Sequence, residues 1–278
     1  MAQSDWPEAY RDRVSRNLGL VTEQEQERLR SSKAAVLGLG GLGGVVFEVL
    51  LRTGIGRFVV ADCDTFEASN LNRQVLAVLE TLGRLKTEVT RERAAAIDLH
   101  VTVDTWESVT AETVGGILEG ADVAVMAIDE LRPCILVSRK ARALGIPLVE
   151  GWAIPFANVR TYTAETLSLE EAYGLPTAGR AVEDLDEAEV KALQGKVLLG
   201  LAEIEGVGDF YDEQTRRRAL EGHISSLAPM VWLTGVMMAV EAVKVLLGWG
   251  ELAKAPAYGL YDPFRHRIPR MGSGSDEV

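Results

Sequence analysis

The chain has 278 residues, of which 47% are hydrophobic and 25% charged, and its formal net charge is −12. This composition is that of a globular chain whose hydrophobic core needs no disulfide or structural metal. Cys63 and Cys134 are the only cysteines, which excludes a disulfide framework and a four-cysteine zinc site, so no zinc is expected. The acidic balance argues against nucleic-acid binding, which requires Lys and Arg beside phosphates.

The longest apolar stretch, residues 224–247, contains Pro229, Glu241 and Lys244. A membrane-spanning helix tolerates such charges poorly, so this stretch predicts a buried helix. Residues 1–7 are polar, and no apolar region of a signal peptide follows them. We therefore expect a cytoplasmic protein that does not bind a membrane.

Residues 1–33 are polar with a helical pattern, in which Thr22 and Glu25 have the spacing of a capping box. Short apolar runs then alternate with helical stretches. Strands are predicted in 34–44, where the run enters a glycine turn, 57–64, 101–106, 121–129, 146–153 and 258–263, and helices in 45–54, 87–97, 133–144 and 226–248. This order predicts an α/β fold: a doubly wound, mostly parallel sheet of Rossmann type with right-handed crossovers.

Residues 165–213 differ from the rest, with thirteen acidic residues, three basic ones and a net charge of −10. Two interpretations stay open: a solvated helical insertion, or a docking surface for a basic partner. We divide the chain into an N-terminal helical arm (1–33), a nucleotide-binding α/β domain (34–164), an acidic insertion or crossover segment (165–225), a C-terminal helix and strand that complete the same domain (226–270), and a disordered tail (271–278).

The segment 38–43, with Gly38, Gly40, Gly41 and Gly43, fits the pattern G-x-G-x-x-G between a predicted strand and a predicted helix, and Gly44 adds a further glycine. Glycines permit the tight turn and let backbone N–H groups approach a phosphate, while the helix N-terminus adds partial positive charge. Asp62 ends the second strand 22 residues after Gly40, where its carboxylate can accept hydrogen bonds from ribose hydroxyls. These residues predict a nucleotide site but do not distinguish NAD from ATP.

A dense polar segment after the second strand bears on that choice. A triphosphate site needs cations beside phosphate oxygens and carboxylates that hold Mg²⁺, whereas a dehydrogenase needs no such cluster there. The candidate residues in this segment are Asp62, Asp64, Asn70, Asn72, Arg73 and Gln74.

Two further residues extend the pattern. Lys86 stands at the start of the next predicted helix, and Asp129 closes the fourth predicted strand, where open α/β sheets place ligands and an acid can bind Mg²⁺ that bridges phosphates. Taken singly, Arg73 is equally compatible with a surface ion pair, Lys86 with a solvated helix residue and Asp129 with a helix cap. Together, after a glycine turn, they favour a triphosphate site.

From about Arg13 to Tyr162 the chain resembles the E1-like activating enzymes, the group of ThiF, MoeB and HesA. The resemblance is carried by GLGGLGG, ADCDTFEASNLNRQ, GRLKTEV and AIDE, of which SNLNRQ is the most specific. The C-terminal residues 227–247 and Tyr261-Asp262-Pro263 are similar more loosely. The resemblance implies an enzyme that binds ATP and Mg²⁺ and transfers AMP to a carboxylate, usually the C-terminal glycine of a ubiquitin-like or sulfur-carrier protein, with release of pyrophosphate.

The resemblance also implies roles for single residues. Asp62 would hold the ribose, Asp129 would bind Mg²⁺, and the phosphates would be held by Asn70, Arg73 and Lys86, with Gln74 nearby.

In this family an N-terminal arginine, in a segment like R-Y-x-R-Q, reaches the ATP site of the other subunit, which implies a homodimer. Here the segment 13–17, RVSRN, occupies that place. Arg16 is the candidate, and Arg11 and Arg13 stay as alternatives because the tyrosine and glutamine of the motif are replaced.

The chain departs from many of these enzymes in its cysteines, because it lacks the two C-x-x-C zinc pairs and has no cysteine in 160–225. Carboxylates on both sides of Cys63 would raise its pKa, so we expect Cys63 and Cys134 to be structural and the acyl group to pass to an external nucleophile. Three other functions stay open: a tRNA-modifying ATP-dependent dehydratase of the same family, which AIDELRP resembles, an NAD-dependent oxidoreductase, and a non-catalytic E1-like subunit.

Overall fold

The computed structural model describes residues 5–220 and 225–268. Its centre is a seven-stranded sheet with the order β3-β2-β1-β4-β5-β6-β7. The parallel strands are β1 (Lys33–Leu37), β2 (Arg57–Ala61), β3 (Thr102–Trp106), β4 (Val123–Met126) and β5 (Leu148–Glu150), and the antiparallel strands are β6 (Ala157–Tyr162) and β7 (Gly259–Tyr261). The mostly parallel α/β fold predicted from the sequence is confirmed.

Helices cover both faces of this sheet. Alternate residues of β1 point to opposite cores: Val36 packs with α3 (Gly41–Thr53), α4 (Lys86–Ile97) and α10 (Ala228–Leu247), whereas Leu37 belongs to the core that contains α5 (Val114–Leu118) and α6 (Leu131–Leu144). Continuous apolar strands are therefore buried on both sides, as expected for a parallel sheet.

The glycine turn belongs to α3, which begins at Gly41 and not at the predicted residue 45. Gly38 has φ +89°, and a Cβ there would lie 2.4 Å from the Ala127 carbonyl oxygen. A Cβ on Gly43 would lie 1.8 Å from the Gly38 carbonyl oxygen. The glycines thus let the first turn of α3 pack directly on the end of β1, which places the helix N-terminus at the edge of the sheet.

Strand β6 is absent from the prediction. Its residues alternate between two covered faces: Val159 packs in the core with α10, whereas Arg160 and Tyr162 face the α6 side. All six residues are buried, including the polar ones. Because polar residues are buried on both faces, the sequence lacks the apolar run or the alternation that marks a strand.

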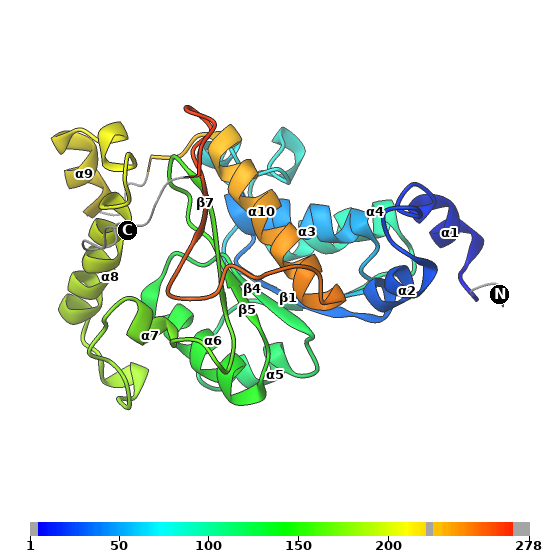
Figure 1. Ribbon diagram of the computed structural model, residues 1–278, viewed down its shortest axis with the longest axis horizontal. Helices are drawn as coiled ribbons and strands as arrows, with labels where there is room; N and C mark the ends of the chain where they lie inside the picture. The colour runs from blue at the N-terminus through cyan, green and yellow to red at the C-terminus, as the bar shows by residue number, and fades with distance from the viewer. Residues whose placement is uncertain (1–4, 221–224, 269–278) are drawn as a thin grey trace, which may run out of the picture.

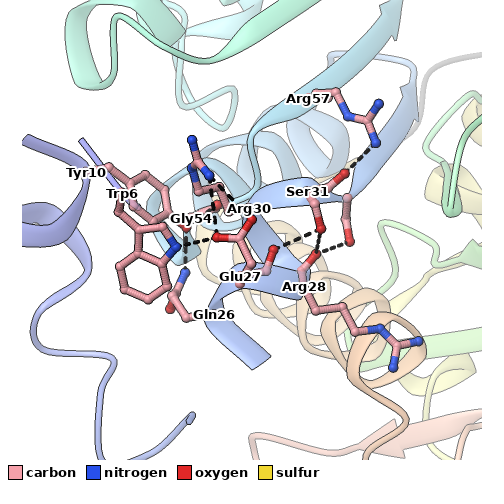
Figure 2. Close-up of polar contacts among 10 residues, drawn as sticks. Trp6, Tyr10, Gln26, Glu27, Arg28, Arg30, Ser31, Gly54 and Arg57 are labelled. Atoms are coloured by element: carbon pink, nitrogen blue, oxygen red, sulfur yellow. Dashed lines mark hydrogen bonds and ion pairs between the residues drawn. The ribbon is translucent and has the colours of Figure 1, made fainter. Parts of the chain in front are cut away.

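The N-terminal segment contains α1 (Glu8–Val14) and α2 (Glu23–Ser31), and the predicted capping box of Thr22 and Glu25 is present. Figure 2 shows how the two helices are joined to the sheet domain. The Tyr10 hydroxyl donates to the Gly54 carbonyl at 2.8 Å and accepts from the Gln26 side-chain amide at 2.9 Å. Arg57 of β2 donates to the Ser31 carbonyl.

The acidic segment folds into α7 (Leu169–Ala172), α8 (Glu187–Ala202) and α9 (Glu213–Leu220). Leu193, Val197 and Leu201 of α8 are buried in the same core as α6. In Figure 1, α8 and α9 lie at the opposite end of the molecule from α1 and α2. Short 3₁₀ helices complete the described elements at Ala68–Asn70, Leu79–Thr81, Val182–Asp184 and Gly208–Phe210. The segment is therefore folded and packed on the domain, and its acidic residues belong to this folded structure.

By length and composition alone, α10 could cross a membrane, and half of its apolar window is buried inside the structure. Its buried side chains include Val231, Met238 and Ala242, which pack with α3 and the sheet. Glu241 is also buried, where it accepts from the Thr161 hydroxyl at 3.2 Å and pairs with Lys244 at 2.6 Å. The predicted helix is present but only half-buried, and the predicted tail at 271–278 lies outside the described residues.

The close packing of α3 predicts opposite effects at two neighbouring glycines. Gly43→Ala places a methyl group against a backbone carbonyl and should destabilise the fold by about 2–3 kcal/mol. Gly44→Ala meets only ordinary contacts at 3.5 Å and should gain up to about 1 kcal/mol of helix propensity. Urea denaturation of both variants tests this, and equal stabilities would contradict the geometry.

Candidate functional site

A cavity of about 740 Å³ opens where the chain leaves β1, β2, β4 and β5. The predicted residues that line it are Gly38, Gly40, Gly41, Asp62, Asp64, Asn70, Arg73, Gln74, Lys86 and Asp129. Three predicted residues, Gly43, Asn72 and Arg16, are not part of the lining. The structure therefore brings together candidates that span more than 90 positions of the sequence.

Asp62 is fixed directly after β2 by backbone donors. The Leu39 N–H donates to Oδ2 at 2.6 Å, and the Asp64 N–H donates to Oδ1 at 2.9 Å. Because each carboxylate oxygen has two lone pairs, Asp62 keeps acceptor capacity for a ligand hydroxyl. The contact with Leu39 also joins the glycine turn to the end of β2.

Lys86 is the first residue of α4 and is buried, so the interpretation of a solvated helix residue is wrong. Its Nζ lies 2.7 Å from the Asp64 carboxylate and 3.7 Å from the Asp62 carboxylate. The side chains of Lys86 and Asp62 are only 6% and 8% exposed, whereas that of Asp64 is 64% exposed. The ammonium group thus bridges an inner and an outer carboxylate at the cavity wall.

Burial raises the pKa of Asp62, and this effect exceeds the opposing influence of the Lys86 ammonium and the two backbone N–H donors. Desolvation disfavours the charged form of the carboxylate, while a nearby cation favours it. The Lys86 ammonium is the largest of the influences that favour the charged form of Asp62.

Arg73 and Gln74 follow the short 3₁₀ helix at 68–70. Among residues 5–220 and 225–268 Arg73 has no ion-pair partner, so the interpretation of a surface ion pair finds no support there. Its Nη1 donates to the Ser69 carbonyl at 3.0 Å and to the Asn72 side chain at 2.8 Å. The Trp232 indole of α10 donates to the Arg73 carbonyl at 2.7 Å and anchors the loop. Gln74 is buried beside Gly40, and its Oε1 has no hydrogen-bond partner among the described residues.

Asp129 lies three residues beyond the end of β4 at Met126, so it does not close the strand as predicted. The Gln194 side-chain amide of α8 donates to its carbonyl at 2.8 Å, which holds the loop in place. The residue is exposed, and within the described part of the chain its carboxylate has no partner. Since Glu130 is the residue at the N-cap of α6 and no side chain caps that helix, the helix-cap interpretation is wrong.

Asn72 and Arg16 have other surroundings. The Asn72 side-chain amide donates to the Ser226 carbonyl at 3.2 Å, so Asn72 supports the loop beside Arg73. Arg16 is exposed and, within the described residues, has no hydrogen-bond or ion-pair partner. Arg13 instead donates to the Leu51 carbonyl at 2.7 Å and pairs with Asp98 at 2.6 Å.

The far wall of the cavity consists of residues that are not predicted from the sequence. This wall includes Trp152 and Ile154 after β5 and part of the acidic segment, which contributes Leu198, Leu199, Leu201, Ala202, Tyr211, Thr215, Arg216 and Ala219. The Arg216 guanidinium is held by the carbonyls of Tyr211 at 3.0 Å and Gly208 at 2.8 Å. The run of three arginines at 216–218, directly after the acidic stretch 165–213, is the signal in the sequence for a basic residue at this wall.

The charges around the cavity indicate whether Mg²⁺ could bind there. Three cationic side chains face six acidic ones: Arg73, Lys86 and Arg216 against Asp62, Asp64, Glu67, Glu107, Asp129 and Glu130. Among residues 5–220 and 225–268, no group of three or more His, Cys, Asp or Glu side chains could hold a metal by itself. A free carboxylate on Asp129 fits the way Mg²⁺ binds with nucleotides, through one or two carboxylates plus phosphate oxygens.

A model of the ThiF family matches residues 14–276. The chain belongs to the ThiF family. A sulfur carrier protein adenylyltransferase of Thermus thermophilus is 38% identical over 149 residues, which cover 52% of this chain and 55% of the relative. A molybdopterin-synthase adenylyltransferase of Haemophilus influenzae is 27% identical over 81% of this chain and 79% of its own length.

The ThiF fold is also shown by solved structures. The Escherichia coli tRNA N6-threonylcarbamoyladenosine dehydratase in complex with ATP has a TM-score of 0.62 and 23% identity, and the match covers 87% of this chain and 96% of that one. The resemblance to the ThiF, MoeB and HesA group is thus confirmed. The match spans about half the length of the Thermus relative, so the activity and substrate of that relative do not transfer directly to this chain.

The two cysteines differ in environment. Cys63 is exposed at the cavity, where burial of the thiol and the carboxylates of Asp64 and Asp62 raise its pKa. Cys134 is buried in α6, and burial raises its pKa well above the usual range. The predicted direction for Cys63 is confirmed, although burial is a larger cause than the neighbouring carboxylates.

These environments predict slow thiol chemistry. At pH 7, iodoacetamide should alkylate Cys63 more slowly than free cysteine, because less thiolate is present, and the rate should keep rising above pH 9. Cys134 should stay unmodified until the protein unfolds. Peptide mass spectrometry along a pH series measures both rates, and rapid modification of either thiol at neutral pH would contradict the prediction.

Proposed function

We propose that this member of the ThiF family is an ATP- and Mg²⁺-dependent adenylyltransferase that activates a carboxylate as an acyl-adenylate. The observation that carries the proposal is the convergence of Arg73, Lys86 and Asp129 on the cavity that contains the glycine turn and Asp62. Arg73 and Lys86 come from the connection between β2 and α4, which Lys86 ends as the first helical residue, and Asp129 comes from the loop after β4. Each supplies a function that a triphosphate needs. The relatives named as adenylyltransferases support the same reaction.

The chain's own residues suggest how the nucleotide binds. The Asp62 carboxylate accepts from the ribose hydroxyls, because both of its oxygens keep a free lone pair. The N-terminus of α3 and the backbone of Gly40 and Gly41 receive the phosphates. Arg73 offers a planar fork of donors, and Lys86 a point charge that can exchange the exposed Asp64 carboxylate for a phosphate oxygen.

Asp129 would hold Mg²⁺, which would supply charge neutralisation between the phosphates. The acidic excess around the cavity makes this cation necessary, because a triphosphate would otherwise meet more carboxylates than cations. Asp129 suits this role since its carboxylate is exposed and the Gln194 contact fixes its backbone.

The reaction joins a substrate carboxylate oxygen to the α-phosphorus, and the bond from that phosphorus to the bridging oxygen of pyrophosphate breaks. Arg73 and Lys86 offset the repulsion between the carboxylate and the phosphates and stabilise charge on the leaving pyrophosphate. Positioning supplies much of the remaining acceleration. Neither cysteine has the lowered pKa of a reactive thiol, so the acyl group passes to an external nucleophile.

The favoured substrate is the C-terminal glycine of a ubiquitin-like or sulfur-carrier protein, or a peptide with a free carboxylate. An NAD-dependent oxidoreductase leaves Arg73, Lys86 and Asp129 without a role, and a non-catalytic subunit gives no reason for all three to line one cavity. A tRNA substrate fits the net charge of −12 poorly, because most of the phosphate-binding energy would be missing.

A homodimer would complete the site. Arg16 is exposed and outside the cavity of its own chain, as an arginine that acts on a second copy must be. Trp232, Val236 and Val240 form an exposed apolar stripe along α10, and Trp232 contacts the Arg73 loop. We place the second copy on this stripe because it continues the surface around the cavity.

ATP–pyrophosphate exchange tests the reaction. Small proteins that end in Gly-Gly should stimulate exchange only with their terminal glycine present and only with Mg²⁺. Unmodified tRNA and tRNA with a carboxylate-bearing adenosine serve as further arms. No exchange with any carboxylate, together with NADH binding in place of ATP, would contradict the proposal.

A mixing experiment tests Asp129 and Arg16 together. Asp129→Ala and Arg16→Ala should each lower exchange by about 100-fold or more while leaving circular dichroism and melting unchanged. After equal mixing and subunit exchange, half of the dimers are mixed and each contains one intact site, so about a quarter of the wild-type activity should return.

Arg91→Ala, which removes an exposed arginine of α4, is the matched control and should keep full activity. Normal turnover by Asp129→Ala would contradict a role for Asp129 in the site. Absence of any recovery on mixing, despite subunit exchange shown by mass spectrometry, would exclude Arg16 from a shared site.

A further inference from the structure

A second cavity, of about 950 Å³, lies between α8 and the outer strands of the sheet. Small residues of α8 leave the space: Ala188, Ala192, Gly195 and Gly200. The opposite wall consists of Arg160 of β6 with Tyr173 and Tyr258. Neither the family resemblance nor the proposed adenylation assigns a role to these residues.

Arg160 is an unusual residue for such a wall, because it is only 3% exposed and yet belongs to the cavity lining. Its guanidinium stacks on the Tyr258 ring at 3.6 Å, and Nη1 donates to the Tyr162 hydroxyl at 3.1 Å. Within the described residues, its Nε–H has no hydrogen-bond partner. A guanidinium has five N–H donors, and a buried cation is costly unless its charge and donors are matched.

Glu150 provides only indirect compensation. It is the register partner of Arg160 on β5, but its Oε2 accepts from the hydroxyls of Tyr162 at 2.9 Å and Tyr173 at 2.8 Å. The Tyr162 hydroxyl therefore stands between the two charges, and no direct ion pair between them is present among the described residues. The other oxygen, Oε1, also has no partner there. The cluster is close to neutral, and Arg160 is the cationic member of it that belongs to the cavity lining.

Besides Arg160, two of the other three charged residues in the described lining of this cavity are positive. The segment 165–213 has thirteen acidic and three basic residues, and two of those three, Lys191 and Lys196, line the cavity. Glu203 is the one acidic residue in the lining that the structure describes. Two of the three basic residues of the most acidic segment thus line a single cavity, which favours an anionic ligand there.

The two cavities adjoin. Leu199 and Leu201 line both of them. Trp152, in the wall of the nucleotide cavity, donates from its indole to the Tyr173 hydroxyl at 2.7 Å, and Tyr173 lines the second cavity. A ligand in the second cavity would therefore lie next to a molecule that reacts in the first.

We propose that the second cavity binds a carboxylate of the acyl substrate, separate from the carboxylate that is adenylated, with Arg160 as the residue that recognises it. The substrate then carries an acidic group near its reacting end, a specification that rests on the proposed adenylation. A carboxylate is favoured over a phosphate because the guanidinium fork matches one charge, while Glu150 would repel a dianion more strongly. The alanine and glycine surface of α8 accommodates a short aliphatic body beside it.

Ligand-observed NMR can test the site without the unidentified substrate. Butyrate is the probe, butyramide its neutral isostere, and inorganic phosphate the alternative anion. Butyrate should bind, butyramide should not, and phosphate should bind more weakly. Arg160→Gln should weaken butyrate binding by about tenfold or more.

Two further variants keep the test independent of folding. Ala192→Phe fills the cavity from an exposed position of α8 without touching Arg160 and should abolish butyrate binding. Arg91→Gln removes an exposed arginine elsewhere and should leave binding unchanged. Unaltered butyrate binding in Ala192→Phe, equal binding of butyramide, or tighter binding of phosphate would each overturn the proposal.

ATP binding measured on the same samples separates the two proposals. ATP binding by wild type without butyrate binding would remove only the second site. Butyrate binding that depends on Arg160 without ATP binding would keep the carboxylate site and remove adenylation.

Discussion

The structure depends on a lysine ammonium group that is almost excluded from water. Lys86 lies between the buried carboxylate of Asp62 and the exposed carboxylate of Asp64, and its position at the start of α4 joins that helix to the end of β2. The Lys86–Asp62 pair is the buried one of the two. Removal of one partner from a buried ion pair leaves an uncompensated charge and costs about 3–5 kcal/mol. The pair therefore fixes both ends of the loop 62–86, which presents Asn70, Arg73 and Gln74.

The same arrangement explains why the cavity is suited to a nucleotide with a metal. Lys86 is paired with the carboxylates of Asp62 and Asp64, so it alone cannot neutralise a triphosphate. With acidic residues in excess around the cavity, an added divalent cation at Asp129 balances the charges. Affinity for ATP and affinity for Mg²⁺ should accordingly be coupled, since Mg²⁺ removes the repulsion that the phosphates would meet, and the phosphates supply further oxygen ligands for Mg²⁺.

Much of the sheet and of its carboxyl edge could be predicted from the sequence, because apolar runs and glycine spacing are local signals. The start of α3 was placed four residues late, since glycines inside a helix lack a local signal for helix formation. Strand β6 is not predicted because polar side chains are buried on both of its faces, Asn158 and Arg160 on one and Thr161 on the other. The far wall of the cavity was missed because α8 and α9 reach it only through tertiary packing, which no spacing in the chain encodes.

The most direct test of the proposed nucleotide and metal site is a crystal structure of the protein grown with ATP and Mg²⁺. We expect ribose hydroxyls on Asp62, phosphates along the N-terminus of α3 within hydrogen-bond distance of Arg73 and Lys86, and the metal between Asp129 and the phosphate oxygens. A nucleotide bound elsewhere, or a metal coordinated without Asp129, would contradict it.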